Sequence, residues 1–259
     1  MRLLLDHLLY KKSSQFLREV PFDTSQPHLL CIGASGSGKT ICAIALLAKE
    51  IYEYYQQTKE APFLLVADYK ADKDFEFLDE LPTFFRFDEV DKSIELALII
   101  LEQRQSKRDS SKRKVILFID EWGSYLSSKD NKQKNEVIAK LSRLMMLGRS
   151  FNIQVFICNQ RGDAEYFGKI RDNFSSMLVL GTLSKETIQM FFSEEKDLIA
   201  SSNPRGVGYL KVSGKKTVKV IVPHISPDKL EICRRWIHFA VTSSSPVSSP
   251  VSSLFTSPD

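Results

Sequence analysis

The stretch Gly33-Ala34-Ser35-Gly36-Ser37-Gly38-Lys39-Thr40 decides the fold of this chain, because it matches the phosphate-binding pattern G-x-x-x-x-G-K-[ST] without a gap. The apolar run His28–Gly33 precedes it and the amphipathic stretch Thr40–Gln57 follows it, so the motif joins a predicted strand to a predicted helix. Glycines allow successive backbone N–H groups to point at phosphate oxygens, and the helix adds the positive end of its dipole. The sequence therefore predicts a phosphate-binding loop made of these eight residues and Ile41.

Four side chains are expected to carry out the chemistry beside this loop. Lys39 brings a mobile positive charge to the phosphates of ATP, and Thr40 supplies a hard oxygen ligand for Mg²⁺. Asp120 ends the apolar strand Val115–Asp120, and Glu121 follows it. In P-loop ATPases an aspartate at such a strand end holds Mg²⁺, and the next glutamate polarises the attacking water. We therefore predict ATP hydrolysis, with Mg²⁺ on Thr40 and Asp120. An acidic strand end on a solvated loop is the interpretation that would hold without the P-loop.

Apolar strands alternate with amphipathic helices along most of the chain. Strands are predicted at 28–33, 63–68, 115–120, 153–159 and 177–181. Helices are predicted at 40–57, 91–105 and 135–147, the last capped by Gly148. Near-continuous apolar strands separated by helices indicate a parallel sheet covered on both faces. A β-hairpin is predicted at 207–212 and 217–222, before a last helix that Ser226 and Pro227 open. The prediction is an α/β fold, an αβα sandwich with a mostly parallel central sheet and a C-terminal β-hairpin plus helix.

Composition sets the broad class of the protein. The chain has 259 residues, 43% of them hydrophobic and 26% charged, which is ordinary for a globular protein with a sizeable core. The net charge of +4 does not by itself predict nucleic-acid binding. The cysteines form no C-x-x-C pair and lie mostly in apolar runs, which predicts buried, reduced thiols and a cytoplasmic location. No stretch is long and apolar enough to predict a membrane span.

The distribution of predicted strands and helices divides the chain into three parts. Residues 1–25 are an N-terminal segment, and residues 26–241 contain the alternating strands and helices. The last part, residues 242–259, holds eight serines and three prolines. Such a composition cannot bury enough apolar surface to order itself, so we predict a disordered tail.

Several short stretches resemble the FtsK/HerA family of hexameric DNA-pumping ATPases. Pro27-His28-Leu29-Leu30 is similar to the approach that FtsK motors use before the P-loop. Asp68-Tyr69-Lys70 is similar to their Asp-Pro-Lys, with Tyr69 in place of proline. Ile119-Asp120-Glu121 resembles their Val-Asp-Glu. The stretch from Gly148-Arg149 to Gln160-Arg161 resembles their Gly-Arg…Thr-Gln-Arg, and looser similarities continue at Asn173-Phe174 and Pro204–Gly208. The resemblance covers residues 26–223.

The resemblance implies a RecA-like motor domain and roles for two further residues. Gln160 ends a predicted strand at the ligand-binding edge of the sheet, and the resemblance makes it the sensor of the γ-phosphate. Arg149 becomes the arginine finger that reaches the ATP of the next subunit. From the residues alone, the alternative for Gln160 is a loop cap formed with Arg161, and the alternative for Arg149 is compensation of a helix dipole. The resemblance implies a ring of six subunits that moves DNA through its pore.

Partners are predicted from charge and from the resemblance together. No base-reading motif is visible, so we expect sequence-independent binding to the DNA backbone. The basic stretch 104–114 is one candidate contact, and Ser127–Lys134 is a candidate pore loop; the alternatives are a solvated loop and a polar connector.

The small size suggests a motor core from a mobile element or phage, and docking on a membrane or a nucleoprotein partner stays open. Two rival functions remain: a conjugative coupling or packaging ATPase acting on single-stranded DNA or a protein–DNA complex, and a nucleotide-switched assembly factor.

Overall fold

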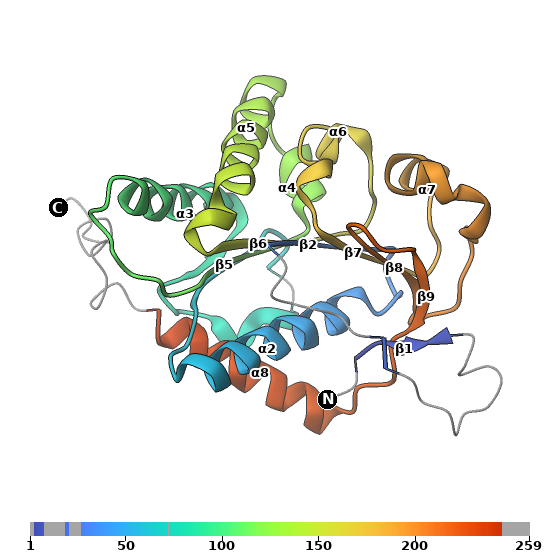
Figure 1. The fold of residues 1–259 in the computed structure, drawn as a ribbon, viewed down its shortest axis with the longest axis horizontal. Coiled ribbons are helices and arrows are strands. Elements are labelled where there is room, and N and C mark those ends of the chain that lie inside the picture. Colours follow the sequence, from blue (N-terminus) through green and yellow to red (C-terminus); the bar gives the residue numbers. More distant parts are fainter. Residues whose placement is uncertain (1–2, 8–18, 21–26, 72, 245–259) are drawn as a thin grey trace.

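The computed structural model describes residues 3–7, 19–20, 27–71 and 73–244, and these form one twisted sheet with helices on both faces (Figure 1). Six neighbouring strands are parallel, which confirms the predicted α/β class. In the described part of the chain the sheet order is β1-β9-β8-β7-β2-β6-β5-β3-β4. The strands are β1 (Leu5–Asp6), β2 (His28–Gly33), β3 (Phe63–Asp68), β4 (Phe84–Arg86), β5 (Val115–Asp120), β6 (Ile153–Asn159), β7 (Ser176–Leu180), β8 (Val207–Val212) and β9 (Val218–Ile221).

The helices form two layers, one on each face of the sheet. Helices α2 (Lys39–Thr58) and α8 (Pro227–Thr242) pack side by side below the sheet in Figure 1. The layer above contains α3 (Val90–Gln105), α4 (Trp122–Ser127), α5 (Asn131–Gly148), α6 (Ala164–Phe167) and α7 (Lys185–Phe192). Because side chains alternate across a strand, Leu29 and Cys31 of β2 join the core under α2, while Leu30 and Ile32 join the core on the opposite face. These two cores hold the αβα sandwich together.

The order of the strands decides where the chemistry meets. Strand β6 lies between β2, which leads into the P-loop, and β5, which ends at Asp120. All three strands are parallel, so their carboxyl ends lie at one edge of the sheet. The predicted phosphate loop, the predicted carboxylates and Gln160 are therefore brought to the same edge.

The C-terminal hairpin extends this sheet instead of forming a separate unit. Strand β8 pairs antiparallel with β7, β9 with β8, and the short strand β1 with β9. Residues Leu5–Asp6 of the predicted N-terminal segment are thus part of the sheet. Helix α8 begins with Pro227 in its first turn, as predicted, and continues through Thr242. The hydroxyl of Ser244 is buried and accepts a hydrogen bond from the Leu64 N–H at 2.8 Å. The rest of the predicted tail lies outside the described residues.

Two details of the prediction were wrong at the ends of α5. The helix begins at Asn131, not at residue 135, because Asp130 and Gln133 form a capping box. Gly148 does not cap it: its φ of −59° is helical, and the left-handed residue is Asn152, with φ of 56°. Glycine is needed at 148 for packing, since a Cβ atom there would lie 3.2 Å from Cβ of Ile153.

Other features of the described residues bear on the class of protein. All four cysteines are buried free thiols, as predicted. Among the described helices, none combines the length and the apolarity that crossing a bilayer would require.

His28 joins the end of α5 to the sheet in its neutral form. Its Nε2 lies 2.7 Å from the Met145 carbonyl oxygen, and its Nδ1 accepts a hydrogen bond from the Val155 N–H at 3.1 Å. Burial, opposed by the bond to Met145 and reinforced by the nearby Arg149 guanidinium, lowers the pKa of His28 from 6.5 to about 4. The neutral ring therefore stabilises the fold at pH 7.

We expect the free energy of unfolding to fall as the pH is lowered from 6.5 to 4, with about 3 kcal/mol of the loss due to His28. The unfolded chain takes up a proton on this ring in that window, whereas the folded chain does not. Urea unfolding at several pH values should show a shallower decline for His28→Gln. The exposed His238→Gln is the matched control, and equal slopes for the two variants would contradict the assignment.

Candidate functional site

The P-loop is the turn between β2 and α2, and its shape depends on glycine. Gly36 and Gly38 have φ of 79° and 90°, in the left-handed region that other residues adopt only with strain. The Ser37 N–H donates to the Ala34 carbonyl at 3.1 Å, and the Cys42 N–H donates to the Gly38 carbonyl at 3.0 Å as α2 begins. These hydrogen bonds hold the loop in shape at the N-terminal end of a 20-residue helix.

The packing behind the loop leaves one polar atom without a partner. Ser37 is buried, and its hydroxyl forms no hydrogen bond with the described residues. A Cβ atom at Gly33 would lie 2.5 Å from the Ser37 Oγ, and one at Gly181 would lie 2.9 Å from the Ser37 Cβ. These glycines therefore let β2 and β7 press against the loop.

Lys39 and the two predicted carboxylates are in contact. The Lys39 Nζ lies 3.5 Å from Oδ1 of Asp120 and 3.1 Å from Oε1 of Glu121, and all three side chains are about 95% buried. Burial opposes the charge on Lys39, but Asp120 and Glu121 outweigh it and raise the pKa of Lys39. Burial raises the pKa of Asp120, and Lys39 counteracts this only in part. In this structure the lysine is thus held by the carboxylates it would leave to reach a phosphate.

The side chain of Glu121 is positioned by a strained backbone conformation. Its φ of 56° is left-handed, which is uncommon outside glycine, and it stands at the N-cap of α4. Its Oε1 accepts from Lys39 and lies 3.2 Å from the Nζ of Lys70, which follows β3. Burial would raise the pKa of Glu121, but the two ammonium groups outweigh it and lower that pKa below its ordinary value. Glu121 is therefore held as a carboxylate at the edge of the site.

Gln160 reaches the same carboxylate from β6. Its Nε2 donates to Oε1 of Glu121 at 3.2 Å. The preceding residue, Asn159, is buried and accepts from the Gly123 N–H at 2.8 Å while its amide donates to the Arg161 carbonyl at 2.6 Å. Asn159 therefore ties the end of β6 to the start of α4 and fixes Gln160 beside Glu121.

Arg149 is the predicted site residue that the structure does not bring to this group. It lies in the 3₁₀ turn Arg149–Phe151 after α5, close enough to His28 to affect that ring electrostatically. His28 begins β2 and the P-loop follows its end, so Arg149 lies roughly 17 Å away, at the opposite edge of the sheet. Arg149 is exposed, as are Met146 at 68% and Leu147 at 38%.

The two stretches proposed for DNA contact are more structured than the sequence suggests. In the basic stretch, Arg104 donates to the carbonyls of Phe151 and Arg113, Arg113 donates to the Ala61 carbonyl, and Lys114 forms a buried ion pair with Glu50. Exposed cations of that stretch are Lys107, Arg108 and Lys112. Residues 127–134 are the end of α4, a short turn and the start of α5, not a loop.

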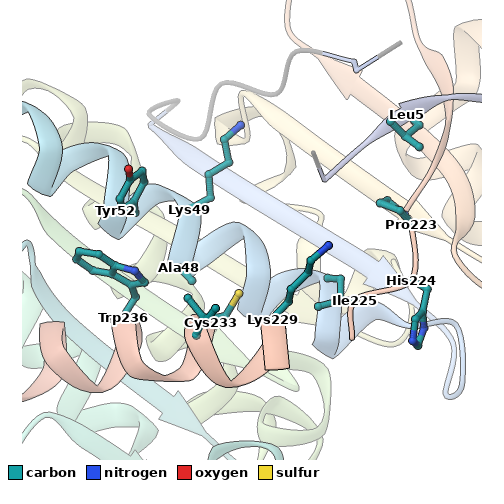
Figure 2. A pocket seen from close by; sticks show the side chains of 11 residues that line it. Leu5, Ala48, Lys49, Tyr52, Pro223, His224, Ile225, Lys229, Cys233 and Trp236 are labelled. Carbon is teal, nitrogen blue, oxygen red and sulfur yellow. The ribbon is translucent and has the colours of Figure 1, made fainter. Parts of the chain in front are cut away.

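An apolar cavity lined by described residues lies elsewhere. It has a volume of about 530 Å³ and opens between α2, α8 and the segment that follows β9 (Figure 2). Its walls are mostly apolar and include Tyr52 and Trp236. Lys49, also at its wall, lies about 15 Å along α2 from Lys39. The cavity includes none of the residues singled out by their motifs.

Sequence reasoning gave no chemical role to two residues that shape this site. From the sequence, Lys70 is named only within the tripeptide Asp68-Tyr69-Lys70. Lys70 follows β3, which is the neighbour of β5, and a lysine in that position indicates positive charge at the edge of the sheet where Asp120 lies. Asn159 was read as the last residue of a strand. A polar side chain that ends a buried strand is the signal that would have found it.

Comparisons with known proteins agree with this geometry. No family model matches the sequence. The chain is 22% identical over 220 residues to the FtsK domain-containing protein YdcQ of Bacillus subtilis (strain 168), which covers 76% of this chain and 43% of YdcQ. The chain thus spans less than half the length of that relative.

Solved structures show the same fold. The pCW3 conjugation coupling protein TcpA, in a monomer form with ATPγS, has a TM-score of 0.62 and 19% identity over 86% of this chain and 67% of its own. EssC (ATPases 2 and 3) from Geobacillus thermodenitrificans has a TM-score of 0.67 and 14% identity over 96% of this chain and 49% of its own. The predicted resemblance is confirmed: this chain resembles FtsK/HerA-type P-loop ATPases in sequence and shares their RecA-like fold.

Proposed function

We propose that this protein hydrolyses Mg²⁺-bound ATP and uses the energy to move DNA through a ring of identical subunits. One observation supports the enzymatic part above all others: Lys39, Asp120, Glu121 and Gln160 come from three separate segments of the chain and meet beside a P-loop. The DNA and ring parts rest on the resemblance to FtsK-type motors and on the surface described below. A likeness at this level of identity shows the fold, so each part needs its own test.

The residues at the loop suit ATP and Mg²⁺ together. The glycine turns at Gly36 and Gly38 leave backbone N–H groups of the loop for phosphate oxygens. Thr40, in the first turn of α2, and Asp120 would hold Mg²⁺, because hydroxyl and carboxylate oxygens are its preferred ligands. When bound, the ion would neutralise charge that develops on the phosphates.

Glu121 is the proposed base that polarises the attacking water. In the described structure Oε1 of Glu121 is occupied by Lys39, Lys70 and Gln160. A triphosphate would compete with the carboxylates for Lys39, which would leave Lys70 and Gln160 as the remaining partners of Oε1 of Glu121. Gln160 then lies between the base and the γ-phosphate and reports whether that phosphate is present.

Lys70→Met tests the role of Glu121 through pH. Lys70 contributes to the lowered pKa of Glu121, so its removal raises that pKa. A base is active when deprotonated, so the acid limb of the kcat profile shifts to higher pH, while the rate above neutral pH changes little. Steady-state ATPase measurements from pH 5 to 9 should show the shift. Lys185→Met, at an exposed position, is the control, and an unmoved acid limb would exclude Glu121 as the titrating base.

Arg149 is proposed as the finger that completes the site of the neighbouring subunit. It lies at the edge of the sheet opposite its own P-loop, and the length of β2 separates it from that site. We therefore expect Arg149 not to act on the nucleotide of its own subunit. Exposed Met146 and Leu147 beside it are the kind of apolar surface that subunit contacts cover. A head-to-tail ring would place this surface on the next P-loop.

Complementation between two inactive variants tests the finger. Lys39→Ala removes the P-loop cation and Arg149→Ala removes the finger, so each ring alone should be inactive. In mixed rings, an Arg149→Ala subunit has an intact P-loop and receives Arg149 from a Lys39→Ala neighbour. We expect part of the ATPase activity to return on mixing. Activity no higher than that of either variant alone would count against a finger in trans.

DNA as the cargo is tested by stimulation of the ATPase. Duplex DNA should raise ATP turnover several-fold, and the effect should weaken as salt rises, because backbone contacts release counterions. Stronger stimulation by single-stranded DNA would favour a conjugative coupling or packaging ATPase. Slow turnover that ignores both nucleic acids would favour a nucleotide-switched assembly factor. Electron microscopy of the protein with DNA and ATPγS would show whether six subunits close a ring.

A further inference from the structure

The turn that precedes β8 is fixed against the P-loop from the outside. The Gly206 N–H donates to the Ser37 carbonyl at 3.0 Å, and the Val222 N–H donates to the Gly206 carbonyl at 2.7 Å. Gly206 has φ of 74°, and a Cβ atom there would lie 3.1 Å from the Val222 carbonyl oxygen. The buried amide of Asn203 donates to the Gly181 carbonyl at 3.3 Å. The hairpin therefore holds this turn in one position beside the phosphate loop.

The side chain of Arg205 lies over the loop from this turn. A Cβ atom at Gly38 would meet Nε of Arg205 at 3.9 Å and its Cγ at 4.0 Å. Gly38 is the residue at which the loop curls into α2, directly before Lys39. The Arg205 side chain is therefore placed at the rim of the cradle.

Arg205 is also a cation that the protein leaves available. Among the described residues no carboxylate forms an ion pair with it, and the residue is exposed. Lys39, by contrast, is shared by Asp120 and Glu121, and Lys70 also contacts Glu121. Asp68, which pairs in register with Asp120, adds a further buried acidic residue at this edge. A triphosphate needs more positive charge than these groups offer.

We propose that Arg205 binds the phosphates of the nucleotide held by its own P-loop. Its guanidinium presents several N–H donors in a plane, which suits phosphate oxygens better than a point charge does. The contact acts within one subunit, unlike that proposed for Arg149. The inference rests on nucleotide binding at the P-loop and is independent of hydrolysis, ring formation and DNA.

Nucleotide titration of the full chain tests this assignment. Arg205→Ala should weaken binding of ATP and ADP by about tenfold, the usual size of a lost hydrogen bond to a charged group. Arg205→Lys should recover part of the lost affinity, because lysine keeps the positive charge but lacks the planar guanidinium group with its several N–H donors. Arg235→Ala is the matched control: Arg235 is exposed on α8 and pairs with Glu231 at 3.3 Å. Thermal unfolding without nucleotide should be the same for all variants.

Inorganic triphosphate separates a phosphate contact from a contact to the base or ribose. If Arg205 binds phosphates, Arg205→Ala should weaken triphosphate binding as much as ATP binding. A loss for ATP alone would overturn the phosphate assignment, and unchanged ATP affinity would overturn the inference while leaving the proposed function standing. If the unmodified chain binds no nucleotide, both fail together.

Discussion

Lys39→Ala should lower ATP turnover by at least about 10²-fold, because it removes the cation that stabilises charge on the transferred phosphate. The structure adds a second consequence. Lys39 contacts two buried carboxylates, and its loss leaves Asp120 with no cation at hydrogen-bond distance among the described residues. The variant is therefore expected to unfold at a lower urea concentration than the unmodified chain, since a buried unpaired charge is costly. ATPase rate and urea midpoint are both measured.

Lys39→Arg separates the two effects. Arginine keeps a positive charge beside Asp120 and Glu121, so most of the stability should return. Its planar, bulkier head does not reproduce the reach of the ammonium group to the phosphates, so turnover should stay low. Lys49→Ala is the control for substitution in α2, because Lys49 lies on the same helix, far from the P-loop, and pairs with Glu53 at 3.7 Å. Wild-type turnover by Lys39→Ala would refute the assignment of the P-loop as the hydrolytic site.

The strands of the parallel sheet could be predicted because each is a nearly continuous apolar run. Strand β5, Val115–Asp120, is buried throughout, and the prediction placed it correctly to the residue. Short elements lack such a signal: β4 has three residues and α6 has four, less than two periods of their patterns. Helix α7, with eight residues, is opened by Ser184, whose side chain accepts from the Thr187 N–H. A serine at this position is a capping signal that can be recognised in the sequence, although no helix is predicted there from the sequence.

The residues of the candidate site also fall into those that the sequence predicts and those that it does not. Motifs predicted Lys39, Asp120, Glu121 and Gln160, and the structure brings them together, because local patterns place Lys39 at the start of the helix after the P-loop and the other three at strand ends. The position of Arg205 could not be predicted from the sequence. It depends on the antiparallel pairing of β8 with β7, which brings residue 205 back to a loop more than 160 residues earlier. Pairing between distant strands is a property of the whole sheet, not of any window of sequence.

Glu121→Gln is the second large effect, with an expected loss of turnover of about 10²–10⁴-fold. Glutamine has nearly the same shape, but its amide cannot accept a proton from the attacking water. Lys39 keeps Asp120 as a partner, so the P-loop retains its cation and ATP should still bind. The expected outcome is a protein that holds ATP without hydrolysing it. Turnover and ATP affinity are measured on the same preparation.

The split between binding and turnover is what identifies a base, because a residue needed only for structure would lower both. Glu121 also caps α4 with a left-handed backbone, and glutamine adopts that conformation no more easily than glutamate, so the backbone cost cancels in the comparison. Glu194→Gln makes the same chemical change at an exposed position and should alter neither quantity. If Glu121→Gln hydrolyses ATP at the normal rate, the water is activated by another group, and Asp120 becomes the carboxylate to test next.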